Sequence, residues 1–218
     1  RQAVAGKGMQ GVVRRPSAHR EESMNLHLPS GYVSNPNPSP CNDDAGGPEW
    51  QVGVYDIAKS FGLPIVDIGC GRARKLQGYA PGFVGVDRAE TVAWLREHRP
   101  EGEWVAADLD KHWPSIDTAG CTIVCSDVIE HLVNTLPLLT WLANQQATIV
   151  LSTPDRVKWR GPEHNGPPPN TEHVREWSFS EFSRLVAEVF GDRETRVMHT
   201  ASFEGGPDNT ITVVVKWQ

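Results

Sequence analysis

Two glycines follow a short apolar stretch in the first half of the chain. Asp67, Gly69, Cys70 and Gly71 come directly after the apolar residues 65–66. Glycine allows backbone angles and a close approach of a ligand that a side chain would block. A glycine turn between a strand and a helix is typical of nucleotide-binding sites, where the helix N-terminus faces the ligand. The sequence therefore predicts a strand, a binding turn and a following helix.

The spacing of this turn differs from that of dinucleotide-binding proteins. Those proteins carry glycines in the order GxGxxG, whereas Ala73 stands at the third position here. Asp67 precedes the first glycine by two residues and would repel a pyrophosphate. A carboxylate at this point suits a ligand that carries an ammonium group, or a water bound to a cation. These features argue against a nicotinamide-dependent enzyme.

Acidic or small side chains also stand where three later apolar runs end. Asp87 follows the run 83–86 and lies 20 residues beyond Asp67, the usual distance for an acid that accepts hydrogen bonds from ribose hydroxyls. Open α/β sheets bind their ligands at such strand ends. The further candidates at or beside these ends are Arg88, Asp108, Leu109, Ser126 and Asp127.

Three histidines are candidates for proton transfer, because imidazole titrates near neutral pH. We predict His173, His164 and His131 as the base, in that order. His131 has a structural interpretation as well. The loop 155–170 carries cations, imidazoles and the aromatic ring of Trp159, which suits a polar, hydroxylated or anionic substrate. A solvated loop without a role in binding is the alternative.

No spacing in the sequence requires a metal site, and we predict none. The four cysteines form no CxxC pair, so we expect them to be reduced and to lie in the core or in loops. A metal-dependent variant would need a cluster of acids and imidazoles. The residues that could supply one are Asp127, His131, Asp155 and His164.

From Trp50 onward, short Val/Ile-rich runs alternate with helical patterns. Ser178 and Glu181 form a predicted capping box. Alternation of this kind predicts a parallel sheet with helices on both faces. The runs 195–203 and 209–217 are separated by a GGPD turn and predict a final antiparallel pair. We expect a Rossmann-like, doubly wound, seven-stranded α/β sheet, with helices over residues 50–62, after Gly71, and over 89–98, 129–143 and 178–190.

The first 48 residues differ from the rest of the chain. Residues 1–23 are polar without an apolar period, and residues 29–48 are dense in Pro, Gly, Asn and Ser. We interpret residues 1–48 as a tail followed by an irregular, lid-like segment, and residues 49–218 as one domain. The side chains proposed for the lid are Tyr32, Asp43, Asp44 and Trp50.

Charge and hydropathy narrow the class of partner. The 218 residues carry a net charge of −6, which gives no general attraction to phosphate backbones, so we expect no nucleic-acid partner. No apolar run reaches the roughly 18–20 residues that would cross a membrane, and no secretory pattern opens the chain. We therefore expect a cytoplasmic protein. The oligomeric state, including a homo-oligomer, is left open.

Together, the segments DIGCGRA, GVD, AADLD, SDVIEHL and LSTPD resemble the motifs of class I S-adenosylmethionine (SAM)-dependent methyltransferases, in the small-molecule type 11/12-like branch. The resemblance covers roughly residues 50–218 and makes residues 49–218 a SAM-binding methyltransferase domain. It implies that Asp67, Gly69 and Gly71, with Cys70, lie along the methionine part of SAM. Asp87 would hold the ribose hydroxyls beside Arg88. The adenine would lie against Asp108 and Leu109, and the sulfonium near Ser126 and Asp127.

The run from Asn170 to Ser178 is similar to one found beside the acceptor pocket in methyltransferases that act on sugars and natural products. The resemblance thus implies methyl transfer to a hydroxyl, or an amine, of a small molecule. Two alternatives remain at this point. One is a methyltransferase that acts on RNA or protein, and the other is a non-catalytic binding subunit with the same fold.

Overall fold

The computed structural model describes residues 26–41, 47 and 49–217. The predicted tail over residues 1–23 and the lid residues Asp43 and Asp44 lie outside the described residues. None of the helices in the described part of the chain has the length and apolar character needed to cross a membrane.

A seven-stranded sheet runs through the molecule in the order β3-β2-β1-β4-β5-β7-β6. Strands β1 to β5 are parallel, and β7 pairs antiparallel with both β5 and β6. This topology confirms the predicted sheet and its final antiparallel pair. The strands are β1 (Ile65–Ile68), β2 (Phe83–Asp87), β3 (Glu103–Ala106), β4 (Thr122–Ser126), β5 (Thr148–Pro154), β6 (Thr195–Thr200) and β7 (Thr210–Val215).

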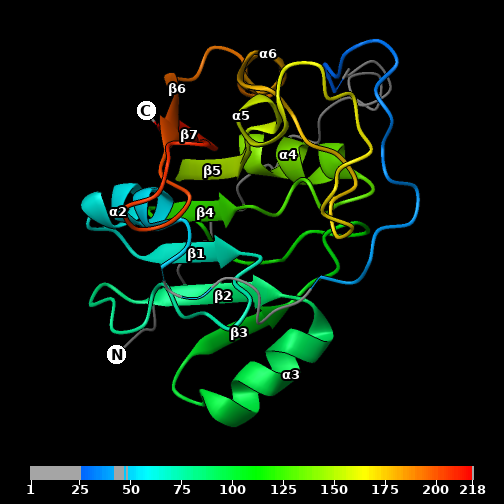
Figure 1. Ribbon diagram of the computed structural model, residues 1–218. Helices are drawn as coiled ribbons and strands as arrows, with labels where there is room; N and C mark the ends of the chain where they lie inside the picture. The colour runs from blue at the N-terminus through cyan, green and yellow to red at the C-terminus, as the bar shows by residue number, and fades with distance from the viewer. Residues whose placement is uncertain (1–25, 42–46, 48, 218) are drawn as a thin grey trace, which may run out of the picture.

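Helices cover both faces of the sheet, as predicted (Figure 1). Helices α2 and α3 pack on the face that carries Ile65 of β1, and helices α4 and α6 pack on the face that carries Val66. Successive side chains of a strand point to opposite faces, so one buried strand serves both layers. The helices are α2 (Val52–Ser60), α3 (Ala89–His98), α4 (Thr135–Ala143), α5 (Arg156–Arg160) and α6 (Phe179–Phe190).

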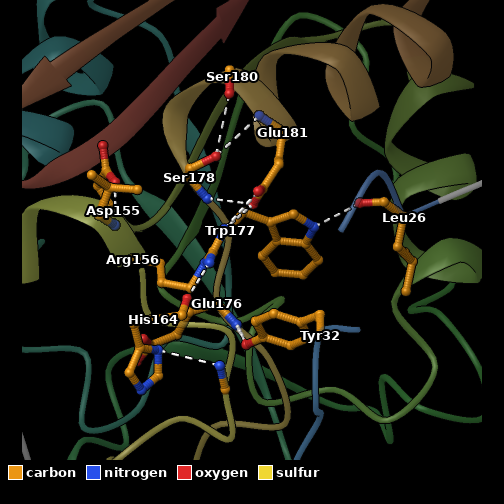
Figure 2. A network of polar contacts seen from close by, with 12 residues as sticks. Leu26, Tyr32, Asp155, Arg156, His164, Glu176, Trp177, Ser178, Ser180 and Glu181 are labelled. Carbon is orange, nitrogen blue, oxygen red and sulfur yellow. Dashed lines mark hydrogen bonds and ion pairs between the residues drawn. The ribbon is translucent and has the colours of Figure 1, made fainter. Parts of the chain in front are cut away.

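Helix α6 begins as the sequence predicts. The Ser178 side chain accepts a hydrogen bond from the Glu181 backbone N–H, and the Glu181 carboxylate accepts one from the Ser178 N–H. The same Glu181 carboxylate forms a buried ion pair with Arg156 at the start of α5 (Figure 2). The start of α6 is thereby fixed to the end of β5.

Three local predictions were wrong. Between β1 and β2 the described chain forms turns and no helix, because Gly69, Gly71 and Ala73 all have positive φ, which interrupts a right-handed helix. The helix predicted over 129–143 begins only at Thr135, after a turn. The loop 155–170 contains the short helix α5, which is capped by the Asp155 side chain.

The N-terminal segment 26–41 lies against the chain that follows α5. Backbone hydrogen bonds join Val33 to Asn165, Asn35 to Val174, and Ser39 to Thr171. In Figure 1 this blue segment runs beside the yellow loop, near the carboxyl ends of the parallel strands. The segment is therefore placed where it borders the strand ends that the sequence singles out.

Candidate active site

The turn after β1 needs glycine at its first position. Gly69 has φ +75°, and a Cβ there would lie 2.4 Å from Cγ2 of Val128. A side chain would therefore meet both backbone strain and a steric clash. We call residues 69–73 the glycine turn. Its backbone passes close to the end of β4 because no side chain intervenes.

Asp87 ties the end of β2 to the glycine turn. Its Oδ2 accepts a hydrogen bond from the Gly71 N–H at 2.8 Å, and its Oδ1 accepts one from the Arg88 N–H at 2.7 Å. Both carboxylate oxygens are thereby fixed at the end of β2, and a carboxylate oxygen can accept more than one hydrogen bond. The Arg88 guanidinium spans Asp87 and the N-terminal segment: its Nε lies 3.9 Å from Asp87 Oδ1, and its Nη2 donates to the Cys41 carbonyl at 3.1 Å.

Asp67 lies beneath the turn and is sealed from solvent. The Tyr55 hydroxyl of α2 contacts both carboxylate oxygens, at 3.0 and 3.2 Å. Burial raises the pKa of Asp67 from 3.8 to about 7, against the opposing effects of Lys75 and the Tyr55 hydrogen bond. The carboxyl is 1% exposed, so its influence on a ligand in the turn would act through charge and turn shape.

The two candidates after β3 are more open. Asp108 accepts a hydrogen bond from Lys111 Nζ at 2.7 Å, and this bond is the main cause that lowers the Asp108 pKa. The Asp108 side chain is 44% exposed. Leu109 packs against the edge of the main core. The pair thus offers an acceptor beside an apolar surface, as the resemblance implies for an adenine.

Asp127 holds the end of β4 in an unusual conformation. It is a non-glycine residue with φ +53°, and its carboxylate accepts hydrogen bonds from Gln51 Nε2 and Ser152 Oγ, both at 2.8 Å. Ser126 Oγ lies 2.9 Å from the same Ser152 hydroxyl. Left-handed backbone at a non-glycine residue costs free energy and is concentrated at functional sites. The two hydrogen bonds hold this strained position.

Glu130 is buried just beyond that strained position. It is fully buried, its Oε2 accepts a hydrogen bond from Thr153 Oγ1 at 3.1 Å, and its Oε1 has no hydrogen-bond partner among the described residues. Burial, with Asp127 nearby, raises its pKa well above the usual value for glutamate. A buried carboxyl oxygen without a partner is costly, which calls for an explanation.

His131 and His173 come together beside Glu130. Their rings meet edge to face with centroids 4.7 Å apart. His131 Nδ1 lies 3.1 Å from the Glu172 carbonyl oxygen and 3.2 Å from the Cys41 sulfur. Burial and the neighbouring His173 lower the pKa of His131 to about 4, so this imidazole is neutral at pH 7. We call Glu130, His131 and His173 the imidazole cluster.

A buried carboxylate orients His173. Glu176 is fully buried, and its Oε1 lies 2.8 Å from His173 Nδ1 and 3.5 Å from Arg160 Nη2. The pKa of Glu176 is lowered because the contacts with His173 and Arg160 outweigh the effect of burial. Glu176 is therefore ionised, and it favours the His173 tautomer that carries its proton on Nδ1.

Hydrogen bonds to backbone carbonyls of the turn after β4 bring the two histidines together. The Val174 N–H donates to the Glu130 carbonyl at 2.7 Å. The Arg175 guanidinium donates to the carbonyls of Leu132 and Val133. These bonds fasten the segment that carries His173 onto the turn after β4.

His164 lies in the loop after α5 and is not part of the imidazole cluster. Its Nδ1 accepts a local hydrogen bond from the Gly166 N–H at 3.3 Å, and its carbonyl accepts from Arg156 (Figure 2). No contact joins it to His131 or His173 in the part of the chain that the structure describes. The predicted order of bases stays a prediction, but the structure pairs His173 with His131.

Two of the side chains proposed for the lid, Tyr32 and Trp50, lie in the described ranges. The Tyr32 hydroxyl accepts a hydrogen bond from the Glu176 N–H at 2.8 Å, and its ring lies beside the Arg156 guanidinium (Figure 2). Trp50 packs edge-on against Phe203. Tyr32 thus supports the segment that carries the imidazole cluster.

Two groups of side chains in the described ranges could hold a metal ion. One is the imidazole cluster, and the other is formed by Cys41, His131 and Glu172. The cluster weighed from the sequence combined Asp127, Asp155 and His164 with His131. Asp155 instead pairs with His199, whose Nε2 lies 2.7 Å from its Oδ2. The sequence pattern singles out neither Glu176 nor Cys41, and the helix that it predicts over 129–143 would begin around Glu130.

The fold has known counterparts. The structure is similar to the plantazolicin methyltransferase BpumL in complex with S-adenosylhomocysteine (SAH), with a TM-score of 0.58, 14% identity, and coverage of 77% of this chain and 83% of that chain. A TehB-like SAM-dependent methyltransferase from Corynebacterium glutamicum gives a TM-score of 0.54 and 18% identity over 79% and 88% of the two chains. The fold is that of the SAM-dependent methyltransferases.

A third similar structure comes from the Pnkp1/Rnl/Hen1 RNA repair complex. Its TM-score is 0.53 at 19% identity, over 76% of this chain, and this chain spans only 41% of the matched one. No protein-family model matches the sequence, and no curated protein matches it. At these identities the methyltransferase likeness establishes the fold, and the chemistry depends on the residues of the site.

Proposed function

We propose that the protein is a SAM-dependent methyltransferase that transfers a methyl group to a hydroxyl of a small molecule. The observation that carries the proposal is the tie between the glycine turn and Asp87. The Asp87 carboxylate receives the Gly71 N–H, and a Cβ at Gly69 would clash with Val128. A backbone cradle beside a fixed acceptor at the end of β2 fits a ribose and the chain attached to it.

The residues that would hold SAM follow the strand ends. Asp87 would accept from the ribose hydroxyls, and Asp108 with Leu109 would face the adenine. The glycine turn would lie along the methionine part, above the buried Asp67. Ser126 and Asp127 stand at the end of β4, between the glycine turn and the imidazole cluster. The sulfonium is therefore expected near Asp127, whose carboxylate stabilises positive charge.

When bound, SAM supplies a methyl group on a sulfonium; its transfer forms an O–C bond while the C–S bond breaks and leaves its electron pair on sulfur. The protein's part is to position the hydroxyl in line and to let its proton leave. We place that hydroxyl at the imidazole cluster. His131 is neutral there and offers a lone pair, whereas the Glu176 carboxylate orients His173 through Nδ1 and Asn170 Nδ2 lies 3.0 Å from its Nε2.

Two observations support a small-molecule acceptor. The net charge of −6 gives no general attraction to a nucleic acid, and segment 26–41 packs along residues 165–174, where it borders the strand ends of the site. An amine acceptor is the nearest variant. An RNA or protein acceptor is the other class to test, since one similar structure belongs to an RNA repair complex. A non-catalytic binding subunit is the remaining alternative.

Calorimetric titration of the purified chain with SAM and with SAH tests the proposal. We expect micromolar binding that Asp87→Ala abolishes. Asp117→Ala is the matched control, because the hydrogen bond that the Asp117 carboxylate makes to the described chain is a local one, accepted from the Ala119 N–H. Methyl transfer from labelled SAM to hydroxylated compounds, amines, RNA and protein would then identify the acceptor class. Absence of binding to a folded chain would refute the enzyme and leave the non-catalytic subunit.

A further inference from the structure

The carboxyl group of the buried Glu130 is only partly hydrogen-bonded among the described residues. Its Oε2 is satisfied by Thr153, but Oε1 is buried without a hydrogen bond among the described residues. An unpaired carboxylate oxygen in the interior is costly unless a proton or a cation completes it. The described groups that face it are the neighbouring Asp127, the two rings of the imidazole cluster and Glu176, and none of these is a fixed cation.

Both histidines of the cluster have an oxygen acceptor at Nδ1. The Glu172 carbonyl lies at 3.1 Å from His131 Nδ1, and the Glu176 carboxylate lies at 2.8 Å from His173 Nδ1. Each Nδ1 therefore donates its proton outward and leaves the lone pair on Nε2. At His173 this lone pair faces Asn170 Nδ2 at 3.0 Å, an amide that an incoming ion would displace. Metal-binding histidines are typically held in this way, by a carbonyl or carboxylate on the far nitrogen. The second coordination layer of a metal site is thus present.

The ligand atoms of Glu130, His131 and His173 all lie within 4.8 Å of one another. Metal–ligand bonds to nitrogen and carboxylate oxygen are about 2.0–2.2 Å long, so small side-chain rotations would bring the three atoms to a shared centre. We propose that the imidazole cluster is a binding site for one divalent transition-metal ion. Its ligands are Nε2 of the two histidines and one oxygen of Glu130.

The donor set selects the class of ion. Two imidazoles and one carboxylate suit Zn²⁺, Fe²⁺ or Co²⁺, whereas Mg²⁺ and Ca²⁺ prefer all-oxygen surroundings. Three protein ligands leave coordination positions open, as in catalytic rather than structural sites. A divalent ion bound by two neutral imidazoles and one carboxylate keeps a net positive charge. The ionised Glu176 behind His173 offsets that charge.

The open positions give the ion a role at this site, and that role rests on the proposed methyl transfer. An acceptor hydroxyl bound to the ion would lose its proton to water more readily, since a bound dication lowers the pKa of coordinated oxygen. His173 then acts as a ligand rather than as the base predicted from the sequence. Binding of the ion itself does not depend on methyl transfer.

The second group, Cys41 with His131 and Glu172, is the competing location. An ion there would need Nδ1 of His131, which already faces the Glu172 carbonyl. It would also leave the Glu130 oxygen without a partner. The geometry therefore favours the imidazole cluster, and variants at Cys41 and Glu172 distinguish the two locations.

Titration of the metal-free full chain with Co²⁺, followed by visible absorption and by calorimetry, tests the site. We expect one ion per chain with absorption bands of nitrogen coordination. Glu130→Gln and His173→Gln should weaken binding tenfold or more, and Glu176→Gln should weaken it roughly 10–100-fold through loss of the contact behind His173. Glu172→Gln and Cys41→Ser are the matched controls and should bind Co²⁺ as the unmodified chain does.

Circular dichroism and SAH binding by each variant would show that the fold is retained. Unchanged Co²⁺ binding in Glu130→Gln and His173→Gln, or loss confined to the two control variants, would overturn the proposal. So would absence of binding by the unmodified chain. Co²⁺ binding by a chain that binds neither SAM nor SAH would uphold the metal site while refuting the proposed enzyme, so the two failures are separable.

Discussion

The glycine turn and the imidazole cluster are neighbours in space but are assembled differently. The turn is tied to Asp87 across 16 residues of chain, and the Gly69 and Cys70 N–H groups donate to the Val86 carbonyl of β2. The cluster is held by contacts between Val174 and Glu130, and between Cys41 and His131, which lies 90 residues away. The first region depends on local backbone geometry, and the second on long-range packing.

This difference decides how substitutions should act. A change in the glycine turn strains a backbone that few other contacts can adjust, so its largest effect should be on ligand binding there. A change in the cluster loosens segments that meet only in the folded chain, so its effect should include global stability. Four experiments test this contrast between local backbone geometry and long-range packing.

Gly69→Ala should be the most damaging change, and Gly78→Ala its matched control. Both glycines have positive φ, +75° and +74°, but only at Gly69 would the new Cβ clash, with Val128. The strain alone costs about 1–2 kcal/mol, and the clash adds to it. We expect Gly69→Ala to weaken SAH binding 100-fold or more by calorimetry and Gly78→Ala to leave it unchanged. Equal effects of both variants would contradict the close approach of the turn to β4.

Arg175→Met should lower stability without touching the glycine turn. The buried guanidinium donates to two carbonyls of the turn after β4 and to Thr135 Oγ1, and charged hydrogen bonds contribute roughly 1.5–3 kcal/mol each before compensation. Urea unfolding should show a loss of about 3 kcal/mol, with little change in SAH affinity. Lys158→Met, whose ammonium is exposed, is the control. A loss of SAH affinity with intact stability would reverse our assignment of Arg175.

Asp67 should make the ligand-free chain less stable as pH rises. Its pKa is about 7 when folded and near 3.8 when unfolded, so the folded state keeps the proton longer. Stability from this group is complete below pH 4 and declines as pH rises to 7, by about 2 kcal/mol between pH 5 and 7. Urea unfolding across this range should show the decline, and Asp67→Asn should remove it. A stability that increases with pH only in the unmodified chain would refute the raised pKa.

Tyr32→Phe should have the smallest effect. It removes the hydroxyl that accepts from the Glu176 N–H but keeps the ring beside Arg156. Loss of one such hydrogen bond costs about 1 kcal/mol. Thermal unfolding should shift by a few degrees, while SAH binding stays the same. The comparison would fail if Tyr32→Phe weakened SAH binding, because segment 26–41 would then act on the glycine turn.

The sheet could be predicted from sequence because its strands are short, apolar and regularly spaced. The acids at their ends follow from the same spacing, and their cofactor roles stay predictions. The absence of a helix after Gly71 could not be predicted, because Ala73 adopts its φ of +51° only in the folded turn. Glu176 resembles an ordinary surface charge in the sequence. Its burial depends on Tyr32 and His173, which only tertiary packing brings to it.

The direction of β7 has a practical consequence for anyone who attaches something to this protein. Because β7 runs antiparallel to β5, the chain leaves it at the amino ends of the parallel strands, at the opposite edge of the sheet from the glycine turn and the imidazole cluster. A surface tether or fluorophore joined after Val215 would leave the candidate active site accessible. A label attached within residues 33–39 would instead lie on the segment that is hydrogen-bonded along residues 165–174, beside the imidazole cluster.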